Sequence, residues 1–120
     1  MGRTNEFTLV ADADFTGKLG CAVVVKAQLV NNTPVATIAT AAKAIDGIVT
    51  DITADGKAGA PLAVAKVGDI ALARIGGAVT VGDELVVGAG GKLTKAGEGV
   101  AVAKALATGK ADERIPVLIK

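Results

Sequence analysis

The feature of this sequence that most constrains its fold is its shortage of side-chain volume. Alanine occurs 24 times and glycine 16 times among 120 residues, so a third of the chain adds almost nothing to a core. Burial of a large aliphatic side chain contributes roughly 1.5–3 kcal/mol, whereas ordering the backbone costs about 1–2 kcal/mol per residue. A core of valine, isoleucine, leucine and alanine is therefore thin for this length. We expect the chain to gain stability from self-association or from binding to a larger surface.

The pattern of apolar residues favours an all-β fold. Valine and isoleucine together number 24, and β-branched residues favour strands. Glycine or aspartate interrupts the apolar pattern about every 8–12 residues, which is typical of short strands in a sandwich or barrel. We predict a small β-barrel or β-tulip-like domain of short antiparallel strands and hairpins. The expected strands are Phe7–Val10, Gly20–Lys26, Val35–Thr37, Gly47–Ile52, Leu62–Val67, Ile70–Ile75, Glu84–Val87, Lys92–Thr94, Val100–Ala105 and Ile115–Ile119.

Glycine-rich segments mark the connections between these strands. A hairpin loop that needs positive φ angles is expected between Glu84–Val87 and Lys92–Thr94. Residues 47–64 and 99–119 both read as strand, polar loop and strand, which indicates a duplicated β architecture. The residues predicted to form structural turns are Gly47, Gly56, Gly82, Asp83, Gly90 and Gly91.

The first 19 residues differ from the remainder in composition. They hold both aromatic residues of the chain, Phe7 and Phe15, and begin with a polar segment. We predict an N-terminal arm over residues 1–19, ordered by contact with a partner, and a β-barrel-like domain over residues 20–120. The alternative is that this segment supplies the first strand of the barrel itself.

Catalytic and metal-binding residues are scarce. Histidine and serine are absent and Cys21 is the single cysteine, which removes the commonest general base, the Ser-His-Asp arrangement and any Cys/His zinc site within one chain. Residues 88–93 resemble a phosphate-binding loop, but Val86 and Leu93 replace residues that the motif requires. Asp12-Ala13-Asp14 lacks the glycine and distal glutamate of a calcium loop. We therefore expect a protein that is not an enzyme and holds no metal or cofactor.

The charge balance argues against nucleic acid and membrane partners. Thirteen basic and twelve acidic residues give a net charge of +1, with the basic residues scattered along the chain, whereas phosphate neutralisation requires a basic patch. No apolar run approaches the roughly 20 residues of a membrane helix, and no signal peptide is visible. Cys21, next to a run of valines, is expected to be a small buried hydrophobe.

From Pro34 to the C-terminus the sequence resembles the small capsid cement (decoration) proteins of tailed bacteriophages. The most distinctive element is Val81-Gly82-Asp83-Glu84-Leu85, a Gly-Asp turn into a strand. The usual Lys-Ala-Gly is altered at Arg74-Ile75-Gly76-Gly77. The other matching segments are residues 44–51, Leu62–Ala65, Gly68–Ala73, Ala78–Val81, the hairpin through Gly91-Lys92, and Gly99–Ala105.

The resemblance implies a homotrimer on the outer capsid surface of the virion, made in the host cytoplasm. It would bridge subunits of the major capsid protein and stabilise the shell against internal DNA pressure. Phe7, Leu9 and Phe15 would then anchor the arm on the capsid or on an adjacent subunit, so deletion of residues 1–15 is expected to leave a folded domain that no longer binds. Two alternatives remain: another phage structural component, such as a head fibre base or a tail-associated domain, and a small ligand-binding β module.

Overall fold

The computed structural model describes residues 6–30, 32–52, 56–97 and 99–120, and all ten predicted strands are present. The largest difference is β2, which continues four residues beyond the predicted end at Lys26. Among the described residues, the single helical element is the 3-10 turn η1 (Ala89–Gly91), and none forms a helix able to span a membrane. The strands are β1 (Glu6–Ala11), β2 (Ala22–Val30), β3 (Thr33–Ile38), β4 (Gly47–Ile52), β5 (Pro61–Lys66), β6 (Ile70–Arg74), β7 (Glu84–Val87), β8 (Leu93–Lys95), β9 (Ala103–Ala105) and β10 (Arg114–Ile119).

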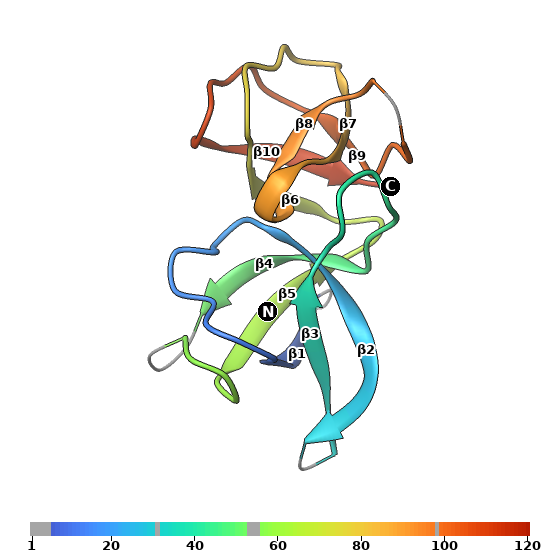
Figure 1. The fold of residues 1–120 in the computed structure, drawn as a ribbon. Helices are drawn as coiled ribbons and strands as arrows, with labels where there is room; N and C mark the ends of the chain where they lie inside the picture. The colour runs from blue at the N-terminus through green and yellow to red at the C-terminus, as the bar shows by residue number, and fades with distance from the viewer. Residues whose placement is uncertain (1–5, 31, 53–55, 98) are drawn as a thin grey trace.

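The first five strands form a closed barrel in the order β1-β3-β2-β4-β5. β1 closes it by pairing with two strands that are distant in sequence. It runs parallel to β3, with Val10 opposite Val35, and antiparallel to β5, with Leu9 opposite Leu62. In Figure 1 this barrel is the lower, blue-to-green half of the molecule.

The role of β1 corrects the prediction of an N-terminal arm over residues 1–19. Residues 6–11 are a barrel strand, and the loop after them is bonded to the barrel: the Phe15 amide donates to the Gly56 carbonyl at 2.7 Å. Alternation explains this, because Leu9 and Ala11 lie on one face of the strand and both are buried. Residues 1–5 lie outside the described residues.

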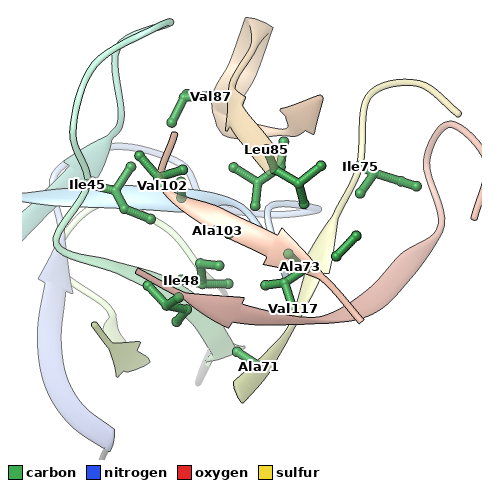
Figure 2. Close-up of a cluster of buried hydrophobic side chains, with 14 of the residues drawn as sticks. Ile45, Ile48, Ala71, Ala73, Ile75, Leu85, Val87, Val102, Ala103 and Val117 are labelled. Carbon is green, nitrogen blue, oxygen red and sulfur yellow. The ribbon is translucent and has the colours of Figure 1, made fainter. Parts of the chain in front are cut away.

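The last five strands form a second sheet in the order β6-β10-β9-β7-β8, the upper half of Figure 1. Its inner face packs against the outside of the barrel. Figure 2 shows Ile48 of β4 beside Ala73 of β6 and Val117 of β10 in this second core. Ala22 and Ala65 join the same cluster. The two halves therefore share a core, and small residues allow their backbones to approach.

The second sheet contains an internal repeat with an offset of 30 residues. Residues 75–85 and 105–115 follow the same path, a bend, a bridge and a tight turn into a strand. The equivalent residues Val79 and Gly109 face each other where the two repeats meet. The amide of each donates to the carbonyl of the other, at 3.0 and 3.1 Å. The structure thus contains a duplication, but it relates segments other than the predicted pair, 47–64 and 99–119.

Reciprocal hydrogen bonds extend this symmetry to the neighbouring residues. Two further bonds from the first repeat have counterparts from the second, and β6 and β7 pair with β10 and β9 of the other repeat. Strands of different repeats therefore pair at β6–β10 and at β7–β9, while β9 and β10 of the second repeat also pair with each other. The matched bonds are Gly82 N–H to Ala105 C=O with Asp112 N–H to Ile75 C=O, and Ala105 N–H to Asp83 C=O with Ile75 N–H to Glu113 C=O.

Candidate interaction surface

The residues predicted to anchor an arm lie in the barrel. Leu9 and Phe15 are 0% and 1% exposed and belong to its central cluster with Val23, Val49 and others. The backbone of Phe7 pairs with Val64, and its side chain lies outside the described residues. A fully buried side chain has no surface to offer to a partner. The structure thus assigns Leu9 and Phe15 to the core, which is the alternative that the sequence left open.

Most of the predicted turn residues lie in turns. Gly82 (φ 93°) and Asp83 form a turn in which the Asp83 carboxylate accepts from the Thr80 amide at 2.9 Å. Gly90 and Gly91, at φ 69° and 81°, form the β7–β8 loop. These positive φ angles favour glycine. Gly56 (φ 72°) is buried beside the loop that carries Phe15.

Gly47 corrects the prediction of a turn, because it is the first residue of β4. It pairs with Val23 on one side and Lys66 on the other. A Cβ atom on Gly47 would lie 2.4 Å from Val64 Cγ1 and 2.5 Å from the Ala65 carbonyl oxygen. Close approach of two strands, and not backbone curvature, requires glycine here.

Ionisable groups in the described part of the chain lie at the surface or in simple local contacts. No polar or charged residue is buried, and no group of three potential metal ligands occurs among these residues. Hydrogen bonds from Thr16 lower the pKa of Asp14 to about 2, and the Lys57 ammonium, 3.2 Å from the Asp14 carboxylate, contributes to this shift. Lys92 lowers the pKa of Asp112 through a 2.6 Å ion pair. Burial raises the pKa of the Cys21 thiol, and its 1% exposure confirms the prediction of a small buried hydrophobe.

The most apolar exposed surface lies on the outer face of the second sheet. β6 alternates in an unusual sense: Ala71 and Ala73 face inward, while Ile70 and Leu72 face solvent at 64% and 48% exposure. The inward alanines lie in the core that the two halves share, together with Ala22, Ile48 and Ala65 of the barrel, where small side chains allow the two halves to approach.

Neighbouring strands extend this surface into a continuous patch. Leu118 of β10 lies opposite Ile70, and Pro116 lies opposite Leu72. The Leu106 amide donates to the Pro116 carbonyl at 3.0 Å, which places Leu106 beside it. We call these five residues the aliphatic strip: Ile70, Leu72, Leu106, Pro116 and Leu118. The strip was not predicted from the sequence, because larger aliphatic residues in an alternating strand were expected to face the core. The signal was the exclusive use of alanine at the intervening positions of β6.

A pair of arginines ends the strip. Arg74 and Arg114 are directly opposite each other on β6 and β10, although like charges in this arrangement repel. Carbonyls of Leu19 and Asp112 accept hydrogen bonds from the Arg74 guanidinium at 3.0 and 2.9 Å. Within the described ranges, neither arginine has a carboxylate at ion-pair distance. The equivalent pair, at the other contact between the repeats, is Glu84 and Lys104, with opposite charges.

A second exposed surface is the projecting end of the β2–β3 hairpin, which extends below the barrel in Figure 1. All residues from Val25 to Val30 are exposed, and Leu29 reaches 63%. β2 pairs with β4 only at Ala22 and Val23. At its base the Val25 amide donates to the Asp46 carboxylate at 2.7 Å, and Lys26 lies 3.8 Å from the Asp12 carboxylate.

Comparison with solved structures identifies this architecture. The chain has the fold of a phage head-fibre base. The matching structure is described as the head fiber gp8.5 N base in bacteriophage phi29, with a TM-score of 0.75 over 96% of this chain and 92% of that chain. The two sequences are 14% identical, so the likeness to the phi29 head-fibre base shows the fold alone.

Two further comparisons gave no match. No protein-family model matches the sequence, and no curated protein matches it. The fold shared with the phi29 head-fibre base spans both the barrel and the second sheet, since it covers nearly the whole of each chain.

Proposed function

We propose that this chain is a structural protein of a phage head, a decoration protein that binds the outer surface of the shell. The observation that carries the proposal is the whole-chain match to the phi29 head-fibre base, a protein of the head by its description. The sequence resemblance to cement proteins from Pro34 onward supports it independently. A role of this kind requires binding and no reaction, which suits a chain without histidine or serine.

Mass action explains how such a protein would stabilise a shell. A ligand that binds only the assembled lattice stabilises it by RT ln(1 + [L]/Kd), or about 2.7 kcal/mol at a concentration of 100 Kd. We propose a homotrimer that bridges major capsid subunits, because three linked contacts raise avidity by roughly 10²–10⁴. Association would also compensate for the thin core. The shell would then better resist the outward pressure of packaged DNA.

The test compares phage heads that contain this protein with heads from a deletion mutant. Decorated heads are expected to retain their DNA at temperatures at which the mutant heads release it, and added purified protein should restore the difference. Sedimentation equilibrium on the purified protein gives its oligomeric state. Heads of equal thermal resistance, with no rebinding of added protein, would refute the proposal.

A head-fibre base is the second candidate, favoured by the description of the structural match. The two roles differ in abundance and in what each protein carries. A decoration protein occupies repeated lattice positions, so its copy number should scale with that of the major capsid protein. A fibre base should be accompanied by a distal fibre segment. Quantitative mass spectrometry of purified particles separates them.

A further inference from the structure

We propose that the aliphatic strip and its two arginines form the surface that docks on the head shell, and that they bind aliphatic side chains bordered by carboxylates. This inference rests on the proposed function and specifies the face and its partner chemistry. The strip lies on the side of the second sheet that faces away from the barrel. Its five members come from three adjacent strands or their ends, so they form one surface.

The inverted alternation of β6 is the first argument. Exposed isoleucine and leucine at 64% and 48%, with alanine at the inward positions, place the larger apolar area in water. Contiguous exposed apolar patches on soluble proteins commonly mark interaction sites. The need for small residues where the two halves approach explains the inward alanines. It does not explain Ile70 and Leu72, since an outward strand position accepts polar residues.

The arginine pair is the second argument, and the internal repeat makes it specific. Each pair joins one residue of each repeat, because Arg74 is equivalent to Lys104 and Glu84 to Arg114. One of these contacts has opposite charges, Glu84 with Lys104, and the other has like charges, Arg74 with Arg114. The fold therefore accepts a complementary pair at this position, yet the copy next to the aliphatic strip has two like charges. A partner carboxylate would relieve their repulsion, and guanidinium groups bind carboxylates in bidentate geometry.

The distribution of charge over the molecule is the third argument. The outer face of β6, β10, β9 and β7 carries four basic residues and one acidic residue: Arg74, Lys104, Arg114 and Lys120, with Glu84. The whole chain has 13 basic and 12 acidic residues, which leaves nine basic and eleven acidic residues elsewhere. A face of net charge +3 on a molecule of net charge +1 orients approach to an acidic surface.

The test measures binding of full-length variants to head shells assembled without this protein from the shell subunit of the same phage. Arg114→Glu is the sharpest variant, because it places opposite charges across β6 and β10 and so does not weaken the fold. It is expected to weaken shell binding by about tenfold or more. Lys95→Glu, an equal charge reversal on β8 at the opposite edge of the sheet, is the matched control and should bind within about twofold of wild type.

Leu72→Glu tests the apolar part of the surface and should also weaken binding by about tenfold or more. Its control is Val81→Glu, an equal substitution at a turn residue that is 58% exposed. Thermal unfolding and sedimentation equilibrium of each variant report fold and oligomeric state.

Three results would overturn the inference. If wild type binds shells and both strip variants bind equally well, the docking face is wrong while the proposed function stands. If the strip variants dissociate an oligomer, the face joins copies of this chain. If wild type does not bind shells at all, the proposed function fails and this inference fails with it.

Discussion

Replacing Phe15 by alanine distinguishes a core residue from a surface anchor. Phe15 is 1% exposed and is the largest fully buried side chain among those that the structure describes. Truncation of a buried phenylalanine to alanine costs about 3–5 kcal/mol. The unfolding entropy is about 2.1 cal/mol/K per residue, or roughly 0.25 kcal/mol/K for 120 residues. The midpoint of thermal unfolding should therefore fall by roughly 12–20 °C.

The assay is differential scanning calorimetry of Phe15→Ala beside wild type. Phe15→Leu is the matched control, because it retains most of the apolar volume and should lose a smaller part of the stability. Deletion of residues 1–15 is expected to unfold the protein, since it removes β1 from a closed barrel. This replaces the sequence-based expectation that such a deletion leaves a folded domain.

An unchanged unfolding midpoint for Phe15→Ala would refute the assignment of Phe15 to the core. A folded protein after deletion of residues 1–15 would refute the closure of the barrel by β1. Loss of shell binding by Phe15→Ala with no loss of stability would restore the role of an anchor.

Three further predictions follow from local contacts. Gly47→Ala should lower stability by about 1–3 kcal/mol in denaturant unfolding, because its Cβ would collide with Ala65, whereas Gly77→Ala, with open space around its Cβ, should be neutral. The pKa of Asp14 is about 2 when folded against 3.8 ordinarily, so its contribution to stability is present above pH 3.8 and lost as the pH falls through 2; Asp14→Asn should therefore reduce the fall in unfolding midpoint between pH 5 and pH 2, and an unaltered fall would contradict this. Cys21 should react with a maleimide far more slowly in the folded protein than after denaturation, because its thiol is buried.

The sequence predicted the strands well because local signals define them. β-branched residues indicate strands, and the glycine or aspartate between them indicates turns, as at Gly82-Asp83, without knowledge of the tertiary structure. Cys21 was placed in the core by its valine neighbours. The position of the repeat was not predicted correctly. The sequence nevertheless shows it at an offset of 30, in the similar segments Ile70-Ala71-Leu72-Ala73-Arg74 and Val100-Ala101-Val102-Ala103-Lys104.

Features that depend on distant pairing were not predicted. β1 closes the barrel by pairing with strands near residues 35 and 62. The sequence of residues 6–11 does not indicate which strands these are. The sequence also did not predict which side chains of β6 face the core, because alanine suits either face of a strand. The docking surface depends on that orientation. It became visible only in the structure, in which Ala71 and Ala73 lie in the shared core while Ile70 and Leu72 face solvent.

The reciprocal hydrogen bonds between the two repeats have a consequence for how the molecule opens. β6 and β7 of the first repeat pair with β10 and β9 of the second, so both strands of the first repeat lose these partners when the second repeat opens. Breakage of the Val79–Gly109 bridge removes both members of a matched pair at once. Amide protons on β6, β7, β9 and β10 should therefore exchange with solvent deuterium through one shared opening event, with a single free energy for all four strands.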